Sequence, residues 1–178
     1  MFFRKNLRVN IFILIFISAG ISGCKKDKKV KEDAIVSTYY LIRHAEKDRT
    51  NPENIDPELN QDGLGRAIRW AEVFETIDLD VIYSTNYERT SMTAAPTSVK
   101  KNIDIKYYTP DEIDIEAFKE ENLGKNILIV GHSNTTPDLV NKLLENYKYQ
   151  DMEDTDNSSL YIVRFIDDEV TDIQLKMN

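Results

Sequence analysis

The chain has 178 residues, and its 31 acidic residues outnumber its 23 basic ones, which gives a formal charge of −8 at pH 7. Three of the basic residues and none of the acidic ones precede residue 24, so the remainder has 20 basic against 31 acidic residues and a charge of −11. This balance argues against a nucleic-acid-binding surface, which needs clustered Lys and Arg in excess. The length allows one sizeable hydrophobic core and is too short for two.

The first 23 residues are predicted to be a signal peptide. Arg4, Lys5 and Arg8 supply a basic n-region, residues 11–17 supply an apolar h-region, and small residues follow up to position 23. The apolar run is shorter than a transmembrane helix requires. We therefore expect export rather than a membrane span.

Cys24 is the only cysteine of the chain, so it cannot form an intramolecular disulfide. The preceding Ile-Ser-Gly together with Cys24 resembles a bacterial lipobox, in which the cysteine becomes the lipidated N-terminus. That resemblance implies a protein anchored through its lipid to a bacterial membrane, facing the periplasm or the cell surface. Residues 24–34 are almost all charged and are predicted to be a disordered tether, whose lysines could contact anionic head groups.

Residues 35–178 are predicted to form one domain in which strands and helices alternate. Apolar or alternating runs predict strands at 36–42, 80–83, 103–108, 126–130, 160–166 and 170–175. Helical spacing or helix-start signals predict helices at 59–77, at 85–99, from 109 onward and at 136–147. Two of these starts carry capping signals, Thr85 with Glu88 and Thr109-Pro110 with Glu112.

The regular alternation predicts an α/β fold, a three-layer α/β/α sandwich whose central sheet is mostly parallel. The run at 126–130 is continuously apolar, as in a strand that is buried on both faces. The last two strands surround Asp167-Asp168 and predict a hairpin, which adds an antiparallel edge to the sheet.

The chain has only two histidines, His44 and His132, and each follows a predicted strand with one residue in between. Because the carboxyl ends of parallel strands meet at one edge of a sheet, two such histidines can come together if their strands are neighbours. Arg43 precedes His44 and adds a cation at the same edge. The pair of strand ends therefore predicts a site rather than two unrelated polar turns.

Arg89 lies in the first turn of the helix that follows the strand at 80–83. A helix N-terminus favours anions, so a cation there suggests a bound anion beside it. The alternative is that Arg89 pairs with one of the many Asp or Glu side chains of the chain.

Four motifs then occur in a recognisable order, namely Arg43-His44-Ala45-Glu46, Leu59-Asn60-Gln61-Asp62-Gly63, Tyr83-Ser84-Thr85 with Arg89-Thr90 and Thr93-Ala94, and Gly131-His132-Ser133-Asn134. This order resembles the histidine phosphatase superfamily, the phosphoglycerate-mutase-like group, and within it the short branch that includes small phosphohistidine phosphatases. The resemblance extends from about residue 36 to residue 163. Ala45 stands where Gly is commoner in the family.

The resemblance implies that His44 is a nucleophile that becomes a phosphohistidine. Arg43 and Arg89 match the family's phosphate-clamping arginines, and His132 matches a second histidine that contacts the phosphoryl group. Guanidinium groups suit phosphoryl oxygens because they donate paired hydrogen bonds. The implied activity is hydrolysis of a small phosphorylated substrate, a phosphate monoester or a phosphoramidate such as phosphohistidine, with no metal or cofactor required.

The general acid is the part of the machinery that the motifs do not identify. Larger family members supply it from a segment that is short here and contains Asp111, Glu112 and Asp114, and Glu46 lies beside the predicted nucleophile. Each of these carboxylates also fits an ordinary role as a helix cap or a solvated charge. Without an acid, substrates with good leaving groups are favoured.

The motifs also bear on three other functions. A serine hydrolase with Ser133 on a nucleophile elbow is excluded, because Thr135 stands where that motif needs Gly and no histidine follows. A metal site lacks a recognisable ligand spacing. A lipid-tethered module that binds phosphorylated ligands without hydrolysing them remains open.

Overall fold

The computed structural model describes residues 34–177. The predicted signal peptide at 1–23, Cys24 and all but the last residue of the predicted tether lie outside the described residues. Within the described part, no helix is both long and apolar enough to cross a membrane.

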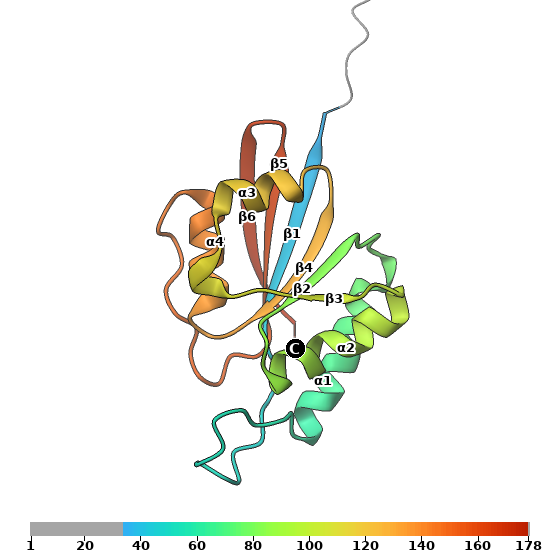
Figure 1. The fold of residues 1–178 in the computed structure, drawn as a ribbon, viewed down its shortest axis with the longest axis vertical. Helices are drawn as coiled ribbons and strands as arrows, with labels where there is room; N and C mark the ends of the chain where they lie inside the picture. The colour runs from blue at the N-terminus through green and yellow to red at the C-terminus, as the bar shows by residue number, and fades with distance from the viewer. Residues whose placement is uncertain (1–33, 178) are drawn as a thin grey trace, which may run out of the picture. The chain divides into compact units, whose positions relative to one another are not determined.

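The domain is built on one six-stranded sheet in the order β3-β2-β4-β1-β5-β6 (Figure 1). The strands are β1 (Val36–Arg43), β2 (Val81–Ser84), β3 (Ile105–Tyr107), β4 (Asn126–Gly131), β5 (Ser159–Ile166) and β6 (Glu169–Lys176). The four strands from β3 to β1 are mutually parallel, whereas β5 and β6 run antiparallel at one edge. The predicted topology, a mostly parallel sheet with a C-terminal hairpin at its edge, is confirmed.

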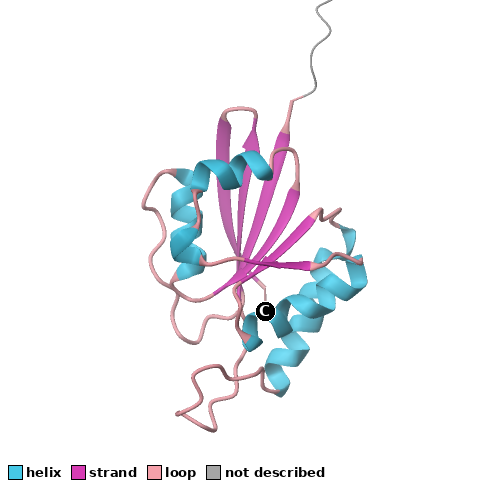
Figure 2. Cartoon of the chain, in the orientation of Figure 1, coloured by secondary structure: helices cyan, strands magenta, loops and turns pink. Residues whose placement is uncertain are grey.

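Helices cover both faces of the sheet (Figure 2). They are α1 (Gln61–Val73), α2 (Glu88–Lys101), α3 (Ile115–Glu121) and α4 (Thr135–Leu144), with short 3-10 turns η1 (Phe74–Thr76) and η2 (Pro110–Glu112). One core contains buried residues of α1 and α2, and a second contains those of α3 and α4. The predicted three-layer sandwich is therefore confirmed.

The strand sequences divide between these two cores because successive side chains of a strand point to opposite faces. In β1, Tyr39 and Leu41 contribute to the core under α3 and α4, while Ile42 contributes to the core under α1 and α2. β4 lies between β1 and β2, and its residues 127–130 are buried on both sides. A central strand between two helical layers needs apolar residues at every position, which explains its unbroken apolar run.

Helix α1 packs closely against the loop that follows β1. The Asn60 side chain caps the helix by accepting from the Gly63 N–H at 2.9 Å, a contact generally worth about 1 kcal/mol. A Cβ on Gly63 would lie 2.1 Å from the carbonyl oxygen of Glu46. Only glycine allows this approach, so Gly63 fixes the path of the chain directly after His44.

The predicted capping box at Thr85 is wrong. The N-cap of α2 is Tyr87, which makes no side-chain capping bond. The Asp56 carboxylate accepts from the Glu88 N–H instead, at 3.1 and 3.2 Å, and so caps the helix from a distant loop. The Thr85 hydroxyl is thus free for the contacts described below.

The predicted helix start at Thr109-Pro110 is also misplaced. Pro110 begins only the 3-10 turn η2, and Thr109 makes no capping bond. Helix α3 begins after Asp114, whose carboxylate accepts from the N–H groups of Glu116 and Ala117 at 3.1 Å each. Asp114 is therefore a helix cap.

Candidate active site

The register of β1 on β4 brings the two histidines together. Arg43 lies opposite Gly131 in the parallel ladder, and the His44 N–H donates to the Gly131 carbonyl at 2.9 Å. The imidazole rings of His44 and His132 then lie with centroids 5.5 Å apart. The structure thus places side by side the two residues that the sequence predicts to meet.

The His44 ring is buried and its tautomer is set by the backbone. Its Nδ1 lies 2.7 Å from the Ala45 carbonyl oxygen, and a carbonyl can only accept, so Nδ1 carries the proton. The Nε2 atom therefore has a free lone pair. Burial, together with the charges of Arg43, His132 and Arg89, lowers the pKa of His44 to about 3 despite the opposing bond to Ala45, so the ring is neutral at neutral pH.

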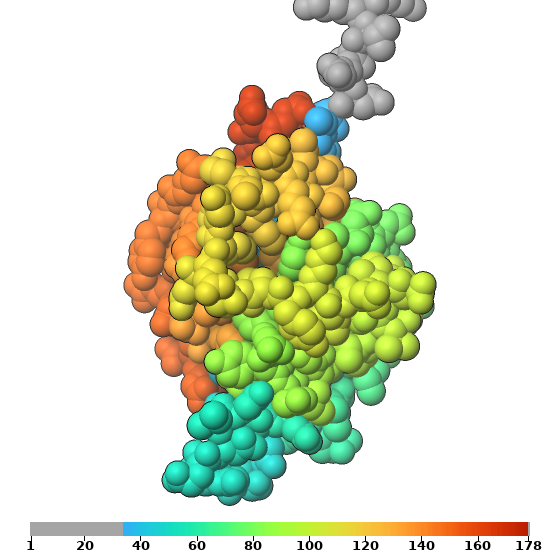
Figure 3. All heavy atoms as spheres, in the orientation of Figure 1, coloured from blue at the N-terminus to red at the C-terminus, as the bar shows by residue number. Residues whose placement is uncertain are grey.

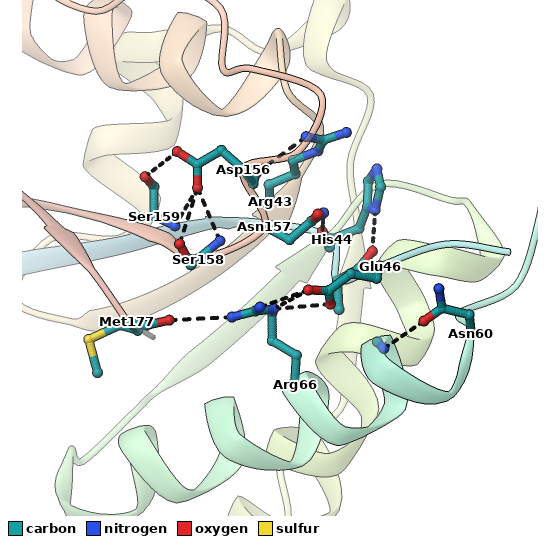
Figure 4. A network of polar contacts seen from close by, with 12 residues as sticks. Arg43, His44, Glu46, Asn60, Arg66, Asp156, Asn157, Ser158, Ser159 and Met177 are labelled. Carbon is teal, nitrogen blue, oxygen red and sulfur yellow. Dashed lines mark hydrogen bonds and ion pairs between the residues drawn. The ribbon is translucent and has the colours of Figure 1, made fainter. Parts of the chain in front are cut away.

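Two further residues that the sequence analysis did not single out for the site fix the backbone around His44. The Asn157 amide donates to the His44 carbonyl at 2.8 Å, and Figure 4 shows this side chain beside His44. The Thr93 hydroxyl accepts from the Ala45 N–H at 2.9 Å and donates to the Arg89 carbonyl at 2.7 Å. Thr93 appears in the third motif, so a signal existed for it, whereas Asn157 lies in a loop without a recognisable pattern.

The Arg43 guanidinium is almost completely buried and is tied to the loop before β5. Its Nη1 donates to the carbonyls of Glu153, Asp154 and Asp156 at 2.9, 3.1 and 3.2 Å. Its Nη2 pairs with the Asp154 carboxylate at 3.0 Å. The Nε–H is buried without a partner, which leaves one donor of a rigidly held cation unused.

Arg89 is held in the same manner by a loop from another part of the chain. Its Nη1 pairs with the Asp56 carboxylate at 3.1 Å, and its guanidinium lies 4.5 Å from the centroid of the Tyr87 ring. Its Nε–H is also buried without a partner. Asp56 is the acidic partner that the sequence analysis left open as an alternative, but it leaves part of the guanidinium available.

The two ring nitrogens of His132 contact Thr85, which follows β2, and Arg89, which lies on α2. Its Nε2 lies 2.8 Å from the Thr85 hydroxyl, and its Nδ1 lies 3.4 Å from Nη2 of Arg89. Burial and then the charges of Arg89 and Arg43 lower the pKa of His132 to about 4. This ring is therefore also neutral at neutral pH when the pocket holds no anion.

These side chains surround a pocket of about 510 Å³. The polar and aromatic residues that line it besides the four predicted ones include Lys47, Thr85, Tyr87, Tyr108, Asp111 and Asp154. The loop at 48–60 (teal in Figure 3) carries Asp56 to Arg89, which lines the pocket. Within residues 34–177 no group of His, Cys, Asp and Glu is arranged to hold a metal ion.

The predicted candidates for the general acid separate in the structure. Asp111 lines the pocket, whereas Glu112 lines a neighbouring hollow. The Glu46 carboxylate turns to Arg66, 2.7 Å from its Nη2, and points away from the His44 ring (Figure 4). Partial burial raises the pKa of Glu46, but the bonds and charge of Arg66 outweigh it and hold the pKa below its usual value. Glu46 is thus held in the ionised form.

Comparison with known proteins identifies one matching sequence family and several similar folds. A sequence profile of the histidine phosphatase superfamily (branch 1) matches residues 39–110. No curated protein matches the sequence at a significant level.

Several solved structures share the fold. A protein from Agrobacterium tumefaciens assigned as the phosphohistidine phosphatase SixA is 22% identical, with a TM-score of 0.55 over 79% of this chain and 99% of that one. The protein histidine phosphatase SixA complexed with tungstate is 14% identical, with a TM-score of 0.60 over 78% and 96% of the two chains. A mycobacterial glucosyl-3-phosphoglycerate phosphatase is 15% identical, with a TM-score of 0.58 over 72% and 90%.

Proposed function

Because a sequence profile of the histidine phosphatase superfamily matches residues 39–110, we propose that the chain belongs to this superfamily and is a phosphatase that hydrolyses phosphate monoesters through a covalent phosphohistidine on His44. The observation that carries this proposal is the state of His44 itself. Its Nδ1 is bonded to a carbonyl, its Nε2 lone pair is free, and two arginines with unpartnered Nε–H groups line the same pocket.

In the first step, Nε2 of His44 attacks phosphorus and the bond between phosphorus and the leaving oxygen breaks. The leaving oxygen receives a proton from an acid or from water. Meanwhile Nδ1 of His44 keeps its own proton, which remains hydrogen-bonded to the Ala45 carbonyl. Water then attacks the phosphohistidine, the P–N bond breaks, and the water proton is released with phosphate or to solvent. Two easier steps thus replace one direct displacement by water.

Arg43 and Arg89 are proposed to neutralise the phosphoryl oxygens during both displacements. Each guanidinium is anchored by a carboxylate, Arg43 on Asp154 and Arg89 on Asp56. Anchored donors need little reorganisation as charge spreads over the oxygens, which is the main source of phosphoryl-transfer catalysis by proteins. His132 supplies a third polar contact to the same group.

The substrate is proposed to be a small phosphorylated molecule, and Asp111 is the proposed source of the leaving-group proton among the predicted candidates. Its place on the pocket wall supports this role. Asp111→Asn should slow the hydrolysis of an alkyl phosphate more than that of p-nitrophenyl phosphate, whose leaving group needs no proton. Equal slowing of both substrates would remove Asp111 from this role.

The decisive experiment compares the wild type with His44→Ala on p-nitrophenyl phosphate and on phosphohistidine. We expect turnover by the wild type alone, and radiolabel from a labelled substrate should remain on the wild-type protein after acid-free quenching. A wild type that binds phosphate, seen as protection against thermal unfolding, yet turns over neither substrate would favour the non-catalytic phospho-ligand-binding module.

The proposal for location rests on sequence alone. We propose export and attachment to a bacterial membrane through lipid on Cys24, which the predicted signal peptide and the lipobox-like motif support. Labelling of the protein by a fatty acid in growing cells, and its loss in Cys24→Ser, would support this. Equal labelling of both proteins would contradict it.

A further inference from the structure

A chain of buried hydroxyl groups leads from helix α2 to the ring of His132. The Thr90 hydroxyl lies 2.8 Å from the Thr85 carbonyl and 2.9 Å from the Tyr87 carbonyl. The Thr85 hydroxyl lies 3.1 Å from the Thr90 hydroxyl and 2.8 Å from Nε2 of His132. Both threonines are almost completely buried, with 1% exposure for Thr85 and 0% for Thr90, so these bonds are largely shielded from water.

The direction of every bond in this chain follows from which groups can only accept and which can only donate. The carbonyls accept, so Thr90 donates to them and its oxygen accepts from Thr85. The Thr85 oxygen then accepts from His132, which places a proton on Nε2. At the other side of the ring Arg89 can only donate, so Nδ1 accepts from it at 3.4 Å. Both sides of the ring therefore indicate the same tautomer.

We propose that Thr85 is a positioning residue that fixes His132 with its proton on Nε2, so that His132 must take up a second proton on Nδ1 when a phosphoryl dianion binds. This inference rests on the proposed phosphate site but not on hydrolysis. The Nδ1 atom faces Arg89, one of the proposed clamps, and the lone pair of a neutral ring would repel a phosphoryl oxygen there. A protonated Nδ1 donates to that oxygen instead, while Nε2 keeps its bond to Thr85.

The charges around His132 explain why the proton arrives with the anion. In the free protein burial first, and then the cations Arg89, Arg43 and Lys47, lower the pKa of His132, and Asp56 opposes them only in part. The two neighbouring rings, Tyr87 edge-on at 4.9 Å and the neutral His44, add no counter-charge. A bound dianion supplies that counter-charge directly.

The test is calorimetric titration of the protein with tungstate, a dianion at about pH 8, in buffers that differ in their heat of ionisation. Wild type is expected to take up about one proton per tungstate bound, as is Thr85→Ser, which keeps the hydroxyl. In Thr85→Val the ring can adopt the neutral tautomer with its proton on Nδ1, so uptake should fall well below one. The affinity should weaken about tenfold, as for a lost buried hydrogen bond.

Thr97→Val is the matched control. Thr97 lies on α2 and is as deeply buried as Thr85. Its hydroxyl has no hydrogen-bond partner, and the residue does not line the pocket. This variant is expected to bind tungstate with the affinity and proton uptake of the wild type. A loss of uptake in Thr97→Val would show that any altered packing of α2 has the same effect, and would overturn the inference.

Other outcomes separate this inference from the proposed function. Absence of tungstate binding would remove the phosphate site and the inference with it, whereas binding without proton uptake would overturn the inference alone. If proton uptake on tungstate binding disappears in His44→Ala, the proton belongs to His44, and the inference about His132 is overturned as well. The ring nitrogens of His132, observed by NMR in the isotopically labelled wild type, test the tautomer without any variant: a free protein with its proton on Nδ1 would contradict the assignment.

Discussion

His44 and His132 stand at corresponding places, directly after two neighbouring parallel strands, yet their rings are held by opposite nitrogen atoms. The Nδ1 of His44 is bonded to the backbone of the next residue, and its Nε2 is free. The Nε2 of His132 is bonded to a hydroxyl from another strand end, and its Nδ1 faces Arg89. His44 therefore has a lone pair fixed in place for attack on phosphorus, whereas His132 is fixed in place to contact the phosphoryl group.

This difference shows that a strand end only brings a histidine to the pocket, and that its partner determines its chemistry. His44 is held by the backbone carbonyl of the next residue, which no side-chain substitution removes. His132 is held by the hydroxyl groups of Thr85 and Thr90, and these can be removed by substitution while the imidazole ring stays. The following predictions test how far the two environments differ, starting with the largest effect.

The first prediction concerns the nucleophile. His44→Ala should lower kcat by about 10⁴-fold or more, because no other group can form the covalent intermediate. His132→Ala should lower kcat less, because the lone pair of His44 remains. Steady-state kinetics on p-nitrophenyl phosphate measures both. Equal losses in the two variants would contradict the division of roles.

The second prediction concerns the arginine beside His132. Arg89→Ala should lower kcat/KM by about 10²- to 10³-fold, since a fixed cation on the phosphoryl oxygens is lost. It should also abolish inhibition by micromolar vanadate. Arg69→Ala is the control, because Arg69 is exposed on α1 and does not line the pocket. Vanadate inhibition that survives in Arg89→Ala would rule out the clamp.

The third prediction concerns pH. The pKa of His44 is lowered from 6.5 to about 3, so the folded protein resists a proton that the unfolded chain accepts. The contribution of His44 to stability should be complete above about pH 6.5 and fall as the pH is lowered toward 3, with a loss from this residue on the order of 3 kcal/mol by about pH 4. Urea unfolding at several pH values measures it. An equally steep fall in His44→Ala would contradict the assignment to His44.

The fourth prediction concerns the backbone of His44. Asn157→Ala should lower kcat about tenfold and stability by about 1 to 2 kcal/mol, because a buried carbonyl loses its donor and the His44 loop relaxes. Asn122→Ala is the control. Asn122 is fully buried, donates to the Phe118 carbonyl at 2.9 Å and does not line the pocket, so its replacement should cost stability but not kcat. Equal effects on kcat would make Asn157 a purely structural residue.

The smallest effect is expected for Glu46→Gln. It removes the ion pair with Arg66, a partly exposed contact worth about 1 kcal/mol or less, and should change kcat by less than about twofold. The comparison uses an alkyl phosphate, where an acid matters most. A large loss of kcat on that substrate would return Glu46 to the role of general acid.

The sheet and the meeting of the two histidines were predictable because both follow from local patterns. Unbroken apolar runs predict central strands, and the residues that directly follow parallel strands must share an edge. His44 and His132 lie at these points, so their proximity needs only the adjacency of β1 and β4.

The partners that tune the site were not predictable in the same way. Asp56 and Asn157 come from loops without periodicity, and their contacts with Arg89 and His44 depend on how those loops fold back. Thr85 was assigned to a capping box because its spacing from Glu88 fits one, yet Asp56 caps the helix and Thr85 binds His132. The spacing of Thr85 and Glu88 identifies a possible hydrogen bond, but the competing partner, Asp56, lies about thirty residues away in sequence. A local spacing pattern cannot detect such a partner.

The direction of β1 also determines at which end of the domain the pocket lies. The strand enters the domain at Val36 and delivers His44 beyond its last residue, Arg43, eight residues on, a rise of roughly 25 Å. The first described residues, 34 and 35, therefore lie at the end of β1 remote from the pocket.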